Sequence, residues 1–201
     1  MKLYHAPGAC SLAVHIALRE AGLPATLVKV DLATRTADDG QDYPALNPKG
    51  YVPTLVLDDG TALTEVSALL QYVADRNPAA GLLPPAGTLE RYRALEWIGF
   101  IATEIHKGFS PLWNPAAHET VRQAAIGTLT RRFEVLEHRL AGNAYLAGPS
   151  FGAADAYAFT VMRWAAPLGM DTAPWPGIRA FLDRVAARPA VRQALAAEGL
   201  A

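Results

Sequence analysis

Cys10 is the only cysteine among the 201 residues, and it stands where an opening strand should pass into a helix. The turn residues 7–9 precede it and the apolar run 12–18 follows. A thiol at a helix N-terminus meets exposed backbone N–H groups and the positive end of the helix dipole, which both favour the thiolate. Because no second cysteine is present, such a thiol can react only with a thiol from outside the chain, which points to glutathione. A lone cysteine can equally be a buried, inert apolar residue.

The composition narrows the class of protein. Half of the residues are hydrophobic (51%) and the formal net charge is −1, which is ordinary for a globular chain and argues against a nucleic-acid partner. No apolar run suits a secretion signal or a membrane span. The five histidines form no cluster with ligand spacing, so no metal is expected. We therefore expect a cytoplasmic protein whose thiol stays reduced.

Residues 1–77 alternate short strands with helices. The pattern predicts a first strand at 3–5, a helix that ends at Gly22, and a second, parallel strand at 26–30. The polar stretch 31–46 reads as a loop with one helical turn. We further expect a hairpin formed by strands 54–57 and 62–64 around the turn at Asp59-Gly60, followed by a helix over 65–76. This order predicts an α/β thioredoxin-like N-terminal domain.

Residues 78–87 are rich in proline and glycine and are predicted to be a linker. Strand patterns end there, so residues 88–201 are predicted to form an all-α C-terminal helical domain. Thr88 is a suitable N-cap for a long helix that reaches Lys107. Four more helices are expected, at residues 119–140, 153–165, 178–187 and 191–198.

Two places besides Cys10 suggest chemistry in the first domain. Pro53 is tolerated at the start of a strand for structural reasons alone, but a cis bond would turn the Val52 backbone toward the thiol, ready to pair with a peptide-like ligand. Glu65 can be a simple dipole partner of its helix. Alternatively, its carboxylate accepts an α-amino group while the N–H groups of Val66 and Ser67 hold a carboxylate, as the γ-glutamyl part of glutathione requires.

The chain resembles the bacterial beta class of cytosolic glutathione transferases over essentially its whole length. The motifs that carry the resemblance are Met1-Lys2-Leu3-Tyr4, Pro7-Gly8-Ala9-Cys10-Ser11-Leu12, Asn47-Pro48-Lys49-Gly50, Val52-Pro53, Leu63-Thr64-Glu65, Gln71-Tyr72-Val73-Ala74-Asp75, Glu90-Arg91-Tyr92, Glu96-Trp97, Glu104-Ile105-His106-Lys107-Gly108, Ser110-Pro111-Leu112 and Ala154-Asp155-Ala156-Tyr157.

The resemblance implies catalytic roles for Cys10 and His106, with both side chains at the glutathione sulfur and a mixed disulfide available to Cys10. It implies a homodimer in which Glu104 reaches glutathione across the interface, and a structural role for Asp155. The residues expected to contact glutathione are Ser11, Arg35, Val52, Pro53, Glu65, Val66, Ser67, Glu104 and Lys107. An apolar electrophile is expected against Phe109, Trp113 and Trp164, although aromatic residues at helical spacing often form a core.

Some features of the second domain bear on these roles. On an α-helix, Gly99, Thr103 and His106 would share one face of small residues, with the imidazole at its edge. A lone histidine can equally be a surface or capping residue. The chain departs from the family pattern at four positions, which are Arg35 in place of Lys, Val66 in place of a small residue, Gly99 in place of an amide, and Gly152 in place of a hydroxyl cap.

The resulting hypothesis is a transferase that conjugates glutathione to electrophilic, mostly apolar small molecules. A second hypothesis keeps the glutathione site and makes Cys10 the attacking group in thiol–disulfide exchange or peroxide reduction. A third is a carrier of hydrophobic ligands without catalysis.

Overall fold

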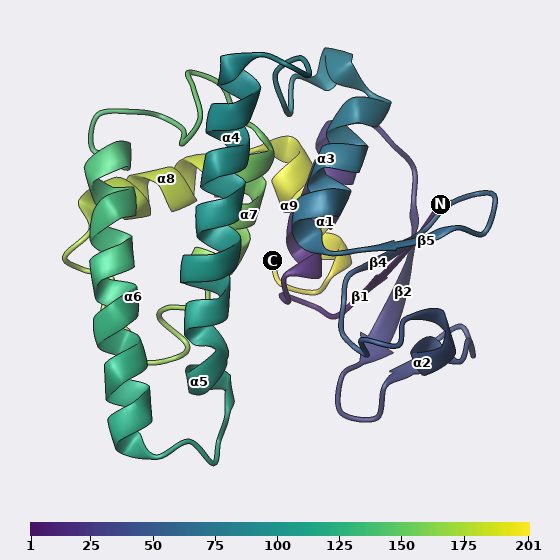
Figure 1. The fold of residues 1–201 in the computed structure, drawn as a ribbon, viewed down its shortest axis with the longest axis horizontal. Helices are drawn as coiled ribbons and strands as arrows, with labels where there is room; N and C mark the ends of the chain where they lie inside the picture. The colour runs from purple at the N-terminus through teal and green to yellow at the C-terminus, as the bar shows by residue number, and fades with distance from the viewer. The chain divides into compact units, whose positions relative to one another are not determined.

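Strand β1 (Lys2–His5) is the central strand of a mixed five-stranded sheet in the computed structural model, which describes residues 1–201 (Figure 1). The strand order is β3-β2-β1-β4-β5. The other strands are β2 (Thr26–Asp31), β3 (Thr36–Ala37), β4 (Thr54–Val56) and β5 (Ala62–Thr64). β1 pairs in parallel with β2 and antiparallel with β4, and β4 pairs antiparallel with β5. The predicted parallel pair and the predicted hairpin are confirmed.

The stretch between β2 and β4 is more regular than a loop. It holds β3, which pairs antiparallel with the end of β2, and the helical turn α2 (Tyr43–Leu46), capped by the Asp42 side chain. The helical turn predicted for this stretch is confirmed as α2, whereas strand β3 was not predicted. A two-residue strand has no periodicity to detect, and it is anchored by the burial of Ala37, which is 9% exposed.

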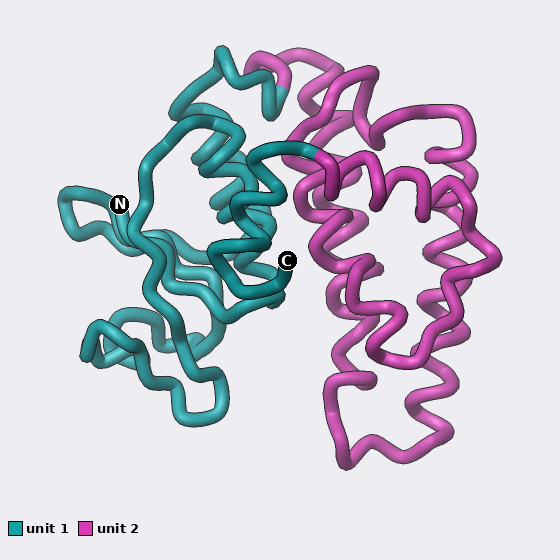
Figure 2. Tube along the Cα trace, turned by 180° about the vertical axis from the view of Figure 1, so that it is seen from behind, with its two compact units in different colours: residues 1–83, 188–201 teal, residues 84–187 magenta.

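The first compact unit comprises residues 1–83 and 188–201 (Figure 2). Besides α2, its helical elements are α1 (Ser11–Glu20), α3 (Val66–Arg76), the 3₁₀ turn η1 (Pro78–Ala80) and α9 (Pro189–Ala197). α1 packs against both α3 and α9, and its residues from Ser11 to Leu18 are all buried. β1, which contacts α1, carries Leu3 and Tyr4 with almost no exposure.

The position of α9 differs from the sequence prediction, which counted it with the helical half. Arg188, just before α9, donates to both carboxylate oxygens of Glu20 on α1, at 2.6 and 2.8 Å. Val191 and Leu195 of α9 are buried. The amphipathic pattern of α9 shows that one face is covered, but it does not identify the neighbour, and here that neighbour is α1.

The second unit, residues 84–187, is entirely helical, as predicted. Its elements are α4 (Leu89–Phe100), η2 (Ile101–His106), η3 (Lys107–Phe109), α5 (Ser110–Trp113), α6 (Glu119–Leu140), α7 (Ala153–Met162) and α8 (Pro176–Ala186). The expected helix from Thr88 to Lys107 begins with the predicted Thr88 cap, but after Phe100 it widens into a π-helical turn and then tightens into a 3₁₀ turn. No helix in the chain combines the length and the apolar character needed to cross a membrane.

Asp155, in the first turn of the buried helix α7, has the structural role that was predicted. Its side chain is fully buried and accepts the N–H groups of Leu146 (2.9 Å) and Gly152 (2.8 Å). The second contact completes the helix cap even though Gly152 has no side chain to contribute. One carboxylate therefore ties the loop that contains Leu146 to the start of α7.

Replacing Asp155 by alanine should lower the free energy of unfolding by about 3 kcal/mol, because two buried N–H groups would lose their acceptor. Urea unfolding monitored by tryptophan fluorescence measures this change. Asp183→Ala, which removes an exposed carboxylate from α8, is the matched control and should shift the value by less than about 0.5 kcal/mol. Equal stability of the two variants would contradict the structural role of Asp155.

Candidate active site

Cys10 lies at the N-cap of α1, directly after the turn at residues 7–9. The side chain is 9% exposed, and its Sγ donates a hydrogen bond of 3.3 Å to the carbonyl oxygen of Val52. The helix N-terminus favours the thiolate, but a thiol must keep its proton to donate to a carbonyl. The surroundings of Cys10 therefore combine a helix N-terminus with a carbonyl acceptor for the thiol proton.

Val52 and Pro53 are joined by a cis peptide bond immediately before β4, so the hypothesis of a cis proline is confirmed. The turn that leads to this bond is held by buried side chains. Asn47, which is 2% exposed, donates to the carbonyl oxygen of Tyr51 (2.8 Å) and to Oγ1 of Thr54 (3.0 Å). The backbone of Val52 beside the thiol is thus fixed by a residue that the sequence indicated only as part of a turn.

Glu65 lies at the N-cap of α3 with φ of 73°, in the left-handed region that non-glycine residues seldom adopt. Its Oε1 accepts hydrogen bonds from Lys49 Nζ (2.5 Å) and from the Tyr51 hydroxyl (3.0 Å). The hydrogen bond from Lys49 to Glu65 raises the pKa of the Lys49 ammonium, and burial together with Glu65 raises the pKa of Tyr51. The Glu65 carboxylate is thus held by two donors while its side chain stays 53% exposed.

The residues after Glu65 begin α3. The N–H groups of Ala68 and Leu69 both donate to the carbonyl oxygen of Glu65. The N–H groups of Val66 and Ser67 lie in the first turn, where a helix provides no intrahelical acceptor. The Val66 side chain is buried, at 6% exposed. The start of α3 therefore offers backbone donors beside the Glu65 carboxylate, as the sequence predicted.

Arg35 and Ser11 have different surroundings. Arg35 is exposed, and a Cβ atom built on Gly50 would lie 3.2 Å from its Nε, so the guanidinium reaches the turn that precedes Val52. Ser11 is completely buried, and its hydroxyl both donates to the carbonyl oxygen of Ala6 (3.2 Å) and accepts the Ala6 N–H (3.3 Å). Ser11 therefore closes the turn before Cys10 and does not present its hydroxyl to solvent.

The turn before Cys10 is also held by Glu198, from the end of the chain. Glu198 Oε2 accepts the Gly8 N–H at 2.9 Å, and Oε1 lies 2.9 Å from His15 Nδ1. Arg19 Nε donates to His15 Nε2 at 2.8 Å. Because arginine can only donate, Nε2 of His15 is an acceptor, and the ring proton is on Nδ1, where it is donated to Glu198. The sequence carried no signal for this network, whose members are far apart in the chain.

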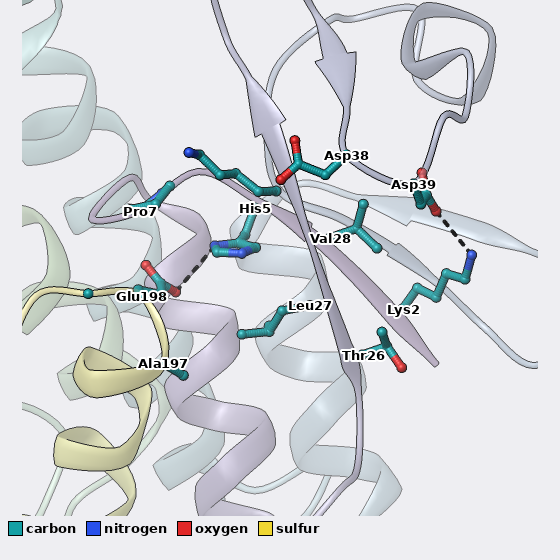
Figure 3. Close-up of a pocket in the computed structure, with 12 residues that line it drawn as sticks. Lys2, His5, Pro7, Thr26, Leu27, Val28, Asp38, Asp39, Ala197 and Glu198 are labelled. Atoms are coloured by element: carbon teal, nitrogen blue, oxygen red, sulfur yellow. Dashed lines mark hydrogen bonds and ion pairs between the residues drawn. The ribbon is translucent and has the colours of Figure 1, made fainter.

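A pocket of about 630 Å³ lies beside Glu198, between β1, β2 and the residues at the end of α9 (Figure 3). It contains none of the residues predicted to bind glutathione. His5 lines it and is 5% exposed, and its Nδ1 has no hydrogen-bond partner but lies 3.7 Å from Glu198 Oε1. At the far end Asp39 accepts from Lys2 Nζ and from the Tyr4 hydroxyl, and burial, followed by the bond to Asp39, raises the pKa of Tyr4 to about 12.

In the second unit, His106 ends the π-helical segment η2. Its Nδ1 lies 2.7 Å from the Tyr157 hydroxyl of α7, and its ring packs edge-on against Trp164 with centroids 5.2 Å apart. The π-helical turn changes the spacing along the helix, so the predicted shared face of Gly99, Thr103 and His106 does not follow from α-helical periodicity. Tyr157 was part of a family motif in the sequence but had no predicted role.

The three aromatic residues predicted to contact the electrophile gather around one indole. Trp164 contacts Phe109 and Trp113, each with centroids 5.7 Å apart. Phe109 is fully buried and Trp164 is 7% exposed, whereas Trp113 is 55% exposed. Phe109 therefore belongs to the core of this unit, and Trp113 offers the accessible apolar surface.

The charged residues Glu104 and Lys107, close to His106 in the chain, have different surroundings. Glu104 accepts a hydrogen bond of 2.7 Å from Arg132 Nε on α6, and the two side chains form a partly exposed ion pair. Lys107 is exposed at the start of η3. The negative charge of the Glu104 carboxylate is therefore already paired with Arg132 of the same unit.

A mixed sheet with a cysteine at the start of its first helix and a cis proline before strand β4, followed by a helical unit, defines a thioredoxin-like protein with an added helical domain. Residues 8–76 match the family described as "Glutathione S-transferase, N-terminal domain", and residues 100–189 match "Glutathione S-transferase, C-terminal domain". The chain belongs to the glutathione S-transferase family.

Individual relatives agree over the full length. The glutathione S-transferase GstA of Escherichia coli O157:H7 is 47% identical over 200 residues, covering 100% of both chains. A sphingomonad glutathione S-transferase solved in complex with glutathione has a TM-score of 0.96 at 47% identity, again with 100% of both chains covered. A bacterial beta-class glutathione S-transferase of Sphingomonas chungbukensis has a TM-score of 0.97 at 45% identity and the same coverage.

His5 should make stability depend on pH. Burial lowers the pKa of His5; Lys29 and His15 act in the same direction, and Glu198 and Asp38 oppose it. The unfolded chain then binds a proton more readily than the folded one, so stability should fall as the pH drops below about 6.5, by at most about 1.4 kcal/mol per pH unit. Urea unfolding at several pH values measures this slope.

The His5→Gln variant should show a shallower slope over the same pH range, whatever its absolute stability. His138→Gln removes an exposed imidazole from α6 and is the matched control. If the slope of His5→Gln equalled that of the unsubstituted protein, His5 would not be the group responsible.

Proposed function

We propose that this glutathione S-transferase binds glutathione on its first unit and conjugates the glutathione thiolate to electrophilic, mostly apolar small molecules. The observation that carries the proposal is the 3.3 Å contact between Cys10 Sγ and the backbone of Val52, at the cis bond to Pro53. It supports a site in which a thiol lies directly against the backbone of the residue before Pro53. A thiol-containing peptide is the class of ligand that uses both.

The proposed recognition of glutathione divides the tripeptide among three features. The γ-glutamyl carboxylate binds the N–H groups of Val66 and Ser67, and the α-amino group binds the Glu65 carboxylate. Val52 pairs with the peptide backbone in the manner of an added strand. Arg35, beside the Gly50 turn, binds the carboxylate of the glycine residue of glutathione. Its planar guanidinium can donate two parallel hydrogen bonds to that carboxylate.

The proposed chemistry requires a thiolate. The glutathione sulfur donates an electron pair to the electrophilic carbon, a C–S bond forms, and the leaving group departs with its electrons or a conjugated acceptor takes them up. Cys10 and His106 are the proposed catalytic residues, because the helix N-terminus at Cys10 and an imidazole donor at His106 would both favour the anion of glutathione. Ser11 supports Cys10 from within the turn, and Lys107 adds a positive charge. Trp113, supported by Phe109 and Trp164, is the proposed surface for the electrophile.

We further propose a homodimer in the cytoplasm, where a reducing environment keeps the single thiol available. In the dimer, Glu104 would reach the glutathione of the partner subunit. Its ion pair with Arg132 would then have to be shared or broken on binding.

Glu65→Gln should weaken the binding of reduced glutathione by about ten- to a hundredfold, because a hydrogen bond to a charged group is lost from the amino end of the ligand. Calorimetric titration measures the affinity. Glu134→Gln, an exposed substitution on α6, is the matched control and should bind like the unsubstituted protein. If the unsubstituted protein does not bind glutathione at millimolar concentration, the carrier hypothesis replaces this proposal.

Cys10→Ala should abolish the mixed disulfide with glutathione, which intact-mass measurement detects, and should slow conjugation of an aromatic electrophile by about tenfold. Glutathione provides the attacking sulfur, so conjugation should persist. Complete loss of conjugation would instead make Cys10 essential for activating the glutathione sulfur. Disulfide exchange that survives in Cys10→Ala would exclude any role for this thiol in the second hypothesis.

A further inference from the structure

We propose that Tyr157 is a positioning residue for His106, and that its hydroxyl donates to Nδ1 so that the ring proton of the neutral imidazole stays on Nε2. The inference rests on the proposed function in one respect, because it takes His106 to be the donor to the glutathione thiolate. The hydrogen bond between the buried Tyr157 hydroxyl and one nitrogen of the His106 imidazole is present without any substrate.

The chemistry of the two atoms assigns the donor. The distance between Tyr157 Oη and His106 Nδ1 is 2.7 Å, which is within hydrogen-bond range. An unprotonated imidazole nitrogen is a stronger acceptor than a phenol oxygen, and a phenol is a stronger O–H donor than a neutral imidazole is an N–H donor. This difference makes Tyr157 the donor and His106 Nδ1 the acceptor.

A neutral imidazole carries one proton on two nitrogens, so accepting at Nδ1 places that proton on Nε2. A proton on Nε2 can be donated to a thiolate. In the opposite tautomer, Nε2 would present a lone pair and repel the anion. Tyr157 therefore decides whether His106 stabilises the thiolate or opposes it.

The surroundings keep the pair in place. Tyr157 is 2% exposed and lies in α7, every residue of which is buried. Its ring meets the His106 ring edge-on, with centroids 5.8 Å apart and planes at 79°. Trp164 contacts the same imidazole at 5.2 Å and 67°. With aromatic rings on two sides, the imidazole has little freedom to turn its Nδ1 away from the hydroxyl.

The backbone fixes both partners as well. α7 packs against η2, the π-helical segment that ends in His106, and Asp155 anchors the first turn of α7 two residues before Tyr157. A residue that orients a catalytic group acts best from such a rigid element. The π-helical turn thus places His106 Nδ1, and the capped helix α7 places the Tyr157 hydroxyl, within hydrogen-bond distance of each other.

The direct test is ¹⁵N NMR of the histidine side chains in the unsubstituted protein. The signals of His106, identified by their absence in His106→Gln, should show a protonated Nε2 and an unprotonated Nδ1. A protonated Nδ1 at neutral pH would overturn the proposal. This measurement needs no substrate and no folded variant of Tyr157.

Tyr157→Phe should keep the KM for glutathione and lower kcat for conjugation by about two- to tenfold, the factor that one neutral hydrogen bond is worth. It should also produce mixed tautomer signals for His106. Tyr145→Phe, which removes a hydroxyl elsewhere in the same unit, is the matched control and should change neither. Unchanged kcat and unchanged tautomer signals in Tyr157→Phe would contradict the proposal.

The role of His106 itself is tested separately by His106→Gln. If this variant conjugates at the original rate, the proposed function of His106 is wrong, whatever the tautomer. If it is slow while Tyr157→Phe keeps the full rate, His106 acts but Tyr157 does not position it, and the present inference fails alone.

Discussion

Glu198 carries a carboxylate that is completely shielded from solvent, and a buried charge of this kind is tolerated only when donors surround it. Its two donors, the Gly8 N–H and the Nδ1–H of His15, come from the opposite end of the chain. The carboxylate thus closes the first unit by joining the segment after α9 to the turn before α1. Because Cys10 follows that turn directly, the position of the thiol depends on a residue 188 positions later in the chain.

The other side of the thiol depends on the turn between α2 and β4. Asn47 fixes the inner part of this turn through Tyr51 and Thr54. The outer part contributes Lys49 and Tyr51, which both hold the carboxylate of Glu65. A left-handed conformation at Glu65 is unfavourable by itself, and these two donors contribute to offsetting it. The same short segment therefore supports the backbone beside Cys10 and the carboxylate at the start of α3.

The parts of the site that could be predicted are those with local sequence signals. Cys10 follows a recognisable turn, Pro53 restricts its own backbone, and Asp155 stands at the start of a helix, so the place of each in the fold follows from a few neighbouring residues. Glu198 and Tyr157 act through contacts across 190 and 51 positions, and no local pattern indicates such a partner. The π-helical turn at residues 101–106 was also missed, because periodicity averaged over a long helix does not reveal one extra residue in a turn. The fold was therefore more predictable than the interactions that orient its functional groups.

The two units differ in the kind of contact they offer, and this difference limits what the protein can select. The residues around Cys10 and Glu65 are backbone groups and charges with fixed partners, which suits a ligand of defined stereochemistry such as a peptide. The cluster around Trp164 is aromatic, with the exposed indole of Trp113 (55% exposed) and the imidazole of His106 both packed against the Trp164 ring. Apolar contact with an indole is not directional, so it discriminates by size and shape more than by functional group. Under the proposed function, a strict choice of thiol and a broad choice of electrophile would follow from these two kinds of surface.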